Sequence, residues 1–236
     1  MPATLLAVKF YIPQPRTALI VRQHLLDRFS AGMRCPLTLV AAPAGFGKST
    51  LLSAWLNRPA TQADAAAQAD IPGWLTLDAA DNHPPRFWAY FIAALQYGIS
   101  KGQREGRAAP DLDLNRLLNY LQSDPPPSIT PLLDELINTI SPVNERLLLI
   151  IDDYHVIRSP EIHEQMTYLL DHLPPALHLV ISTRADPSLP TARYRARGQL
   201  NEFRAADLRF SVAEAENFFK NVSAIPIGAE EIDAIQ

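Results

Sequence analysis

The chain has 236 residues, 47% of them hydrophobic and 19% charged, which fits one large globular domain or one domain and part of another. A net charge of −4 argues against a nucleic-acid groove as its main feature, and the single cysteine, Cys35, excludes a disulfide framework and a cysteine metal cluster. The N-terminus lacks a signal-peptide layout and no apolar run approaches the roughly 18 residues that a membrane helix needs, so we expect a cytoplasmic protein with no membrane partner.

The first 36 residues predict an extended segment followed by a helix. Pro13 and Pro15 favour an extended chain over residues 9–15, because proline does not fit a helix interior. Apolar residues then recur at helical spacing, which predicts a helix over residues 17–29 that Gly32 ends.

A phosphate-binding loop is predicted directly after this helix. The apolar run over residues 37–41 is typical of a buried strand, and the chain then breaks at a glycine-rich turn. Lys48 and Ser49 open a helix with an apolar face. Strand, glycine-rich turn, Lys-Ser and helix follow one another in the order of a P-loop, although the first glycine of the usual pattern is replaced by Ala42.

The residue types of this loop suit polyphosphate binding. Gly45 and Gly47 allow unusual φ angles, so that backbone N–H groups and the helix N-terminus can face the phosphates. Lys48 is expected to reach the β- and γ-phosphates, and the Ser49 hydroxyl to bind Mg²⁺. The predicted phosphate-binding residues are Ala42, Pro43, Ala44, Gly45, Phe46, Gly47, Lys48, Ser49 and Thr50.

The middle of the chain alternates between strand and helix signals. Its expected elements are a surface loop over residues 57–72, a strand over 73–77, a helix from Pro84, a loop over 101–110, and helices over 114–121 and 130–140. Arg86 could face the nucleotide or solvent, and solvent is favoured.

A second motif follows the apolar run over residues 147–151, where Asp152 and Asp153 come directly after the predicted strand. Ligands of open α/β sheets bind at the carboxyl ends of the strands. With a P-loop earlier in the chain, this is the Walker B pattern. Asp152 is expected to hold the Mg²⁺ shell through water, and Asp153 to orient or deprotonate the attacking water.

The last third supplies two further strands, over residues 177–182 and 199–203. Arg184, at the tip of the first, either senses the γ-phosphate or is a surface arginine. The arginine-rich stretch over residues 193–204 favours a solvated or interdomain surface over a nucleic-acid patch. A capping box at Ser211 opens a helix.

The alternating strands and helices of the whole chain predict an α/β P-loop NTPase with a parallel five-stranded sheet, helices on both faces and right-handed crossovers.

Five motifs together resemble the nucleotide-binding domain of MalT-type regulators, which are large ATP-binding LuxR-family transcription activators of bacteria and members of the STAND class of signalling NTPases. The resemblance extends from Lys9 to about Phe219. Its motifs are residues 42–50 (APAGFGKST), 74–88 (WLTLDAADNHPPRFW), 151–157 (IDDYHVI), 181–187 (ISTRADP) and 208–215 (LRFSVAEA).

The resemblance implies a switch that is closed and monomeric with ADP, opens and self-associates with ATP and a small-molecule inducer, and is reset by hydrolysis. It places the phosphate loop on residues 42–49, the Mg²⁺ aspartate on Asp152 and the strand-end arginine on Arg184. Adenine would lie against Ile20, Val21 and Arg22. It also implies that the inducer and DNA bind through domains absent from these residues.

The expected organisation is an N-terminal extension and helix near the adenine over residues 1–36, the NTPase domain over 37–210, and the start of a helical domain over 211–236. Three functions stay open: a slow ATPase switch, a productive ATPase of the AAA+ type, and a small-molecule kinase. The shorter acid of Asp153, where a glutamate is usual, favours slow turnover. No acceptor base or lid arginines are visible for a kinase.

Overall fold

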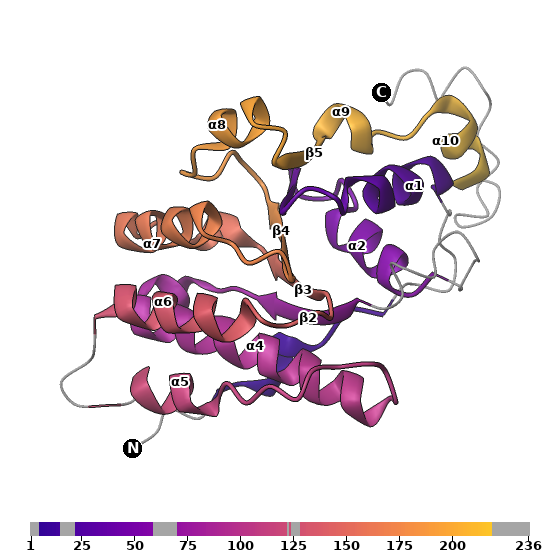
Figure 1. Cartoon of the computed structure of the whole chain (residues 1–236). Coiled ribbons are helices and arrows are strands. Elements are labelled where there is room, and N and C mark those ends of the chain that lie inside the picture. The colour runs from indigo at the N-terminus through magenta and orange to yellow at the C-terminus, as the bar shows by residue number, and fades with distance from the viewer. Residues whose placement is uncertain (1–4, 15–21, 59–69, 122, 124–127, 219–236) are drawn as a thin grey trace.

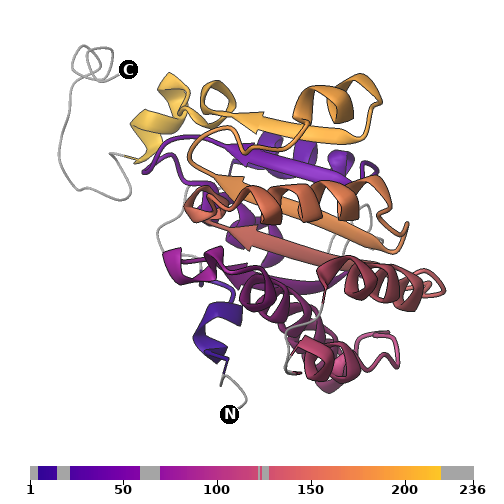
Figure 2. The same ribbon diagram turned by 90° about the vertical axis from the view of Figure 1, so that its left-hand side faces the viewer.

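The computed structural model describes residues 5–14, 22–58, 70–121, 123 and 128–218. Their centre is one parallel sheet of five strands in the order β2-β3-β4-β1-β5 (Figures 1 and 2), which confirms the predicted fold class. The strands are β1 Leu37–Ala41, β2 Ile71–Thr76, β3 Leu147–Asp152, β4 Leu177–Thr183 and β5 Leu200–Arg204.

The register of the sheet brings the two predicted motifs to one edge. β4 lies between β1 and β3, and it pairs with both in parallel. Ala41 stands opposite Thr183, and Thr76 stands opposite Asp152. The turns that follow β1, β3 and β4 therefore leave the sheet side by side at its carboxyl edge, where open α/β sheets bind ligands.

Helices cover both faces of the sheet. α1 and α2 lie on one face, and α4, α6 and α7 lie on the other (Figure 1). The helices are α1 Gln23–Gly32, α2 Lys48–Leu56, α4 Pro84–Arg104, α5 Asn115–Leu121, α6 Ile129–Ile140, α7 Pro160–Asp171, α8 Thr191–Ala196, α9 Ala205–Leu208 and α10 Val212–Phe218. Three 3₁₀ turns are η1 Ala7–Phe10, η3 Ala79–Asn82 and η4 Tyr154–Val156.

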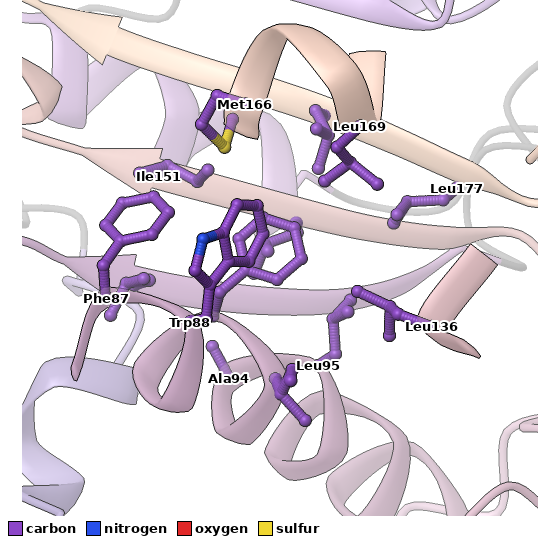
Figure 3. Packing of buried hydrophobic residues seen from close by; sticks show 14 of the residues in the cluster. Phe87, Trp88, Ala94, Leu95, Leu136, Ile151, Met166, Leu169 and Leu177 are labelled. Carbon is purple, nitrogen blue, oxygen red and sulfur yellow. The ribbon is translucent and has the colours of Figure 1, made fainter. Parts of the chain in front are cut away.

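Strand β3 is covered on both faces, which explains the unbroken apolar run in its sequence. Successive side chains of a strand point to opposite faces, so a strand covered on both sides needs no polar alternation. Leu149 and Ile151 join the core under α4, α6 and α7, whereas Leu148 and Ile150 join the core under α1 and α2. Figure 3 shows the larger core, in which Phe87 and Trp88 of α4 face Ile151 and Met166.

Several predicted boundaries are wrong, for local physical reasons. Of the helix predicted over residues 17–29, residues 17–21 lie outside the described residues, and α1 extends from Gln23 to Gly32, the glycine predicted to end it. β2 starts at Ile71 and so contains Pro72, which is tolerated because β2 pairs only with β3 among the described strands. α4 continues to Arg104, into the stretch predicted as a loop, and ends with the basic last turn that helix C-termini favour.

In the N-terminal segment, which was predicted to be extended over residues 9–15, η1 takes residues 9 and 10 into a 3₁₀ turn, whereas Tyr11 has an extended backbone. η1 lies against β2, the edge strand of the sheet. Within the described residues, no helix combines the length and the apolar character needed to cross a membrane.

Candidate nucleotide and magnesium site

The turn after β1 has the backbone of a phosphate cradle. Gly45 and Gly47 adopt left-handed conformations with φ of 87° and 75°, which side chains with a Cβ rarely adopt. Ala42, which stands where the usual pattern has glycine, is buried and donates its N–H to the carbonyl of Thr183 at 3.2 Å. This hydrogen bond extends the β1–β4 pairing by one residue.

The N-terminus of α2 opens onto this cradle. Its N-cap is Gly47, and no side chain among the described residues caps the first turn, so the positive end of the helix is available to an anion. Lys48 is nearly buried, and its ammonium donates to the carbonyls of Ala42 at 2.8 Å and Pro43 at 3.0 Å. Burial lowers the pKa of Lys48, while the nearby carboxylates of Asp152 and Asp153 oppose that shift.

The P-loop and β3 meet through one hydrogen bond. The Ser49 hydroxyl donates to Oδ2 of Asp152 at 2.8 Å, and Oδ1 of the same carboxylate accepts from the backbone N–H of Asp153 at 3.0 Å. Asp152 is 4% exposed. A hydroxyl and a carboxylate oxygen, converging beside a phosphate cradle, are ligands that Mg²⁺ takes with nucleotide phosphates. These residues therefore fit the cation.

In the parts of the chain that the structure describes, no group of three or more His, Cys, Asp or Glu side chains is placed to hold a metal ion by itself. Mg²⁺ rarely occupies all-protein cages and usually keeps one or two protein ligands, phosphate oxygens and several waters. Ser49 and Asp152 suit this mode of binding.

Asp153 carries its carboxylate in a strained turn. It is the one residue other than glycine, among those described, with a positive φ, at 58°. Its Oδ1 lies 3.6 Å from Nδ1 of His155 and 4.0 Å from Nε of Arg184. Burial lowers the pKa of His155, against the attraction of Asp153. Lys48, Asp152, Asp153 and Arg184 thus gather at one place.

His155 was not predicted as a site residue. Its only signal in the sequence is its position two residues after Asp153, and a 3₁₀ turn over Tyr154–Val156 is what brings it back to that carboxylate.

The predicted adenine segment is only partly described, since Ile20 and Val21 lie outside the described residues. The guanidinium of Arg22 is bound to the segment after β5: it pairs with Glu214 at 2.9 Å and donates to the carbonyl of Leu208 at 2.8 Å. Its side chain links the start of α1 to the chain leading into α10. Contact of residues 20–22 with adenine stays a prediction.

The other candidate arginines are held by carboxylates. Arg86 is partly exposed, as predicted, and its Nε lies 3.1 Å from Oδ1 of buried Asp81. Arg193 pairs with Asp171 at 2.6 Å, and Arg195 pairs with Glu202 at 2.8 Å. These pairs neutralise part of the arginine-rich stretch and argue against a nucleic-acid patch.

Residues 16–182 match the AAA ATPase domain family. This match spans well over half of the chain, so the chain belongs to that family. Nucleotide binding, usually with Mg²⁺, is the property that the family implies, and the geometry of Lys48, Ser49 and Asp152 fits it.

Two solved structures share the fold. One is a signal transduction ATPase with numerous domains (STAND) with a tetratricopeptide repeat sensor, from Pyrococcus horikoshii, at a TM-score of 0.54 and 14% identity. The other is the ORC1 protein of Aeropyrum pernix in complex with DNA, at 0.53 and 13%. They cover 98% and 91% of this chain, which spans 29% and 51% of theirs.

Proposed function

We propose that this AAA ATPase domain is an ATP/ADP switch of the STAND type, from an inducer-responsive LuxR-family activator that resembles MalT. The single observation that carries the nucleotide part is the convergence of Lys48, Ser49 and Asp152 at the carboxyl edge of the sheet. The MalT-type part rests on the five sequence motifs, and the fold it shares with a STAND protein supports it.

Each residue has a chemical role in this proposal. Lys48 leaves the carbonyls of Ala42 and Pro43 and turns to the β- and γ-phosphates, which are stronger acceptors. Bound Mg²⁺ would supply charge neutralisation between the phosphates. Asp153 orients the attacking water, and Arg184 stabilises charge on the γ-phosphate.

The position of Arg184 supports a resetting switch over a motor. An arginine that stabilises the transferred phosphoryl group can come from the same chain or from a neighbour. Here Arg184 lies 4.0 Å from Asp153 within one chain, so the site holds its own candidate arginine. A productive AAA+ ATPase remains the alternative function. In that case the arginine would come from an adjacent subunit, as it does in AAA+ assemblies.

The organisation of the chain forms part of the proposal. Residues 1–36 would approach the adenine, residues 37–210 form the NTPase domain, and residues 211–236 begin a helical domain. The protein would self-associate in the ATP state, while the inducer and DNA would bind elsewhere in a longer protein. The link between Arg22 and Glu214 suits such a switch, because it joins the adenine side to the helical segment.

The test starts with the nucleotide that the purified protein carries. The protein is denatured, the released nucleotide is identified by chromatography, and ATP and ADP are then titrated with Mg²⁺ by calorimetry. Tightly held ADP with slow turnover is the expected result. Rapid turnover from an empty site would favour the AAA+ alternative.

Lys48→Ala tests the role of the P-loop lysine. Its matched control is Lys101→Ala, the same substitution at a partly exposed position on α4. We expect Lys48→Ala to lose nucleotide affinity by about a hundredfold or more while keeping its fold. Equal affinity in the two variants would remove the P-loop from the mechanism.

A further inference from the structure

The turn that carries Asp153 and His155 is held in place by a buried residue, Tyr154. The N–H of Val156 donates to the carbonyl of Asp153 at 3.1 Å, which closes the 3₁₀ turn. Tyr154, between the two site residues, is 1% exposed, and its hydroxyl lies 3.0 Å from Nδ1 of His163 in α7. This anchor holds the centre of the turn but leaves its far end to other contacts.

The far end of the turn is held by Asn82, which comes from η3 after β2. Nδ2 of Asn82 donates to the carbonyl of Val156 at 2.8 Å, and Oδ1 accepts from the N–H groups of Arg158 at 2.6 Å and Ser159 at 3.2 Å. A second Nδ2 bond, to Ala79 at 3.1 Å, fixes the amide on its own element. Two donors and two acceptor positions are used, which is the full capacity of the side chain.

Asn82 itself stands on a rigid support. The backbone N–H of Asp78 donates to Oδ2 of Asp81 at 2.9 Å, and the N–H of Ala80 donates to Oδ1 of Asp78 at 2.8 Å, so η3 has a closed capping box. Asp81 is fully buried and pairs with Lys9 of the N-terminal segment at 2.5 Å. A buried carboxylate needs such a partner, so Lys9 fixes η3 in place.

We propose that Asn82 is a positioning residue for nucleotide hydrolysis, because it holds the turn that presents Asp153 and His155 to the phosphate site. The inference rests on the proposed ATPase function and adds to it a residue from η3, the turn that follows the neighbouring strand β2. In this proposal Asn82 makes no contact with the nucleotide. Its side chain fixes the backbone of residues 156–159. Because this backbone closes the turn that starts at Asp153, it also fixes the direction of the Asp153 carboxylate.

Only an amide of this length satisfies all of these contacts. The near-isosteric change Asn82→Asp would keep the two acceptor bonds but would set a carboxylate oxygen against the carbonyls of Ala79 and Val156, which is locally repulsive. Asn82→Ala removes all four bonds and leaves the Arg158 and Ser159 N–H groups without these partners. Misplacing a catalytic group by about 1 Å can cost about a hundredfold in rate.

The test compares Asn82→Asp and Asn82→Ala with Asn119→Asp, which makes the same charge change at an exposed position of α5. ATP and ADP affinities, single-turnover hydrolysis and the melting temperature are measured for each full-length variant. Hydrogen exchange is followed over residues 154–162, since the N–H groups of Arg158 and Ser159 lose their acceptor only in Asn82→Ala.

We expect both Asn82 variants to bind ATP and ADP within about threefold of the parent and to hydrolyse ATP at least about tenfold more slowly. Faster exchange in Asn82→Ala should be confined to residues 154–162. Unchanged hydrolysis in a folded variant, equal losses of affinity and rate, or failure of both variants to fold would overturn the inference. A parent protein that binds no nucleotide would instead overturn the proposed function, so the two failures are distinguishable.

Discussion

The hydroxyl of Ser49 donates to Oδ2 of Asp152 at 2.8 Å, across 103 positions of the sequence. The contact joins the first turn of α2, which follows β1, to the end of β3, and β4 separates β1 from β3 in the sheet. The two oxygens that suit Mg²⁺ are therefore held together by the fold. A cation would replace a hydrogen bond there and would not have to assemble its ligands.

Asp152→Asn should remove the magnesium dependence of nucleotide binding. The amide keeps the shape of the carboxylate but loses the charge that holds the cation. We expect the affinity for ATP with Mg²⁺ to fall by about tenfold or more, and the affinity in a chelator to stay within about twofold. Calorimetry with and without Mg²⁺ checks this, with the exposed change Asp113→Asn as the control. An unchanged magnesium dependence would exclude Asp152 as a ligand.

Asp153→Asn should separate binding from hydrolysis. The side chain lies beside the site and is bonded to neither the P-loop nor the Ser49–Asp152 pair, so its charge is not needed for affinity. We expect ATP affinity near that of the parent and hydrolysis reduced by about a hundredfold or more. Single-turnover assays give both quantities. Turnover at the parent's rate would remove Asp153 from the mechanism.

Arg184→Ala should weaken the distinction between ATP and ADP. Its guanidinium is about half exposed, 4.0 Å from Asp153, and so is free to turn to a γ-phosphate. We expect ATP affinity to fall by about tenfold and ADP affinity to change by less than about twofold, because only ATP carries the group that it would contact. The matched control is Arg116→Ala, at an exposed position of α5. Equal losses for both nucleotides would contradict a γ-phosphate role.

The sequence was most informative where one short segment carries both structure and chemistry. Residues 37–50 and 147–153 predicted their strands, the edge at which they end and the residues that gather there, because strand periodicity and loop chemistry are local properties. Asn82 and His155 were missed for the opposite reason. Asn82 acts across 74 positions on the backbone of Val156, and a backbone acceptor leaves no pattern of residue types.

Asp70→Asn should stabilise the fold above about pH 6. Asp70 is 3% exposed, neither of its carboxylate oxygens has a hydrogen-bond partner among the described residues, and Arg146 stands 3.7 Å away. Burial raises the pKa of Asp70 to about 6, against the opposing effect of Arg146 and Arg58. The folded state therefore holds its proton more tightly than the unfolded state, and stability is lost as pH rises from about 4 to about 6.

We expect the neutral amide to add about 1–3 kcal/mol to the free energy of unfolding at pH 7 and nothing at pH 4. Urea denaturation at the two pH values measures it, with the exposed change Asp111→Asn as the control. A loss of stability at pH 7 would show that the charge of Asp70 is needed by its arginine neighbours.

His178 should make the fold sensitive to acid. Its ring lies between β1 and β4 with Nε2 3.0 Å from the hydroxyl of Thr38, and the residue is 3% exposed. Burial and, to a smaller extent, the nearby charge of Arg146 together lower the pKa of His178 to about 4. The folded state therefore keeps a neutral ring below the pH at which the unfolded chain, with an ordinary pKa of about 6.5, takes up a proton. Stability is expected to fall by about 3 kcal/mol as pH drops from about 6.5 to about 4.

His178→Gln should remove this slope, whereas the exposed His172→Gln should retain it. Urea denaturation of both variants across that range decides the matter: equal slopes would mean that the acid sensitivity arises from other groups.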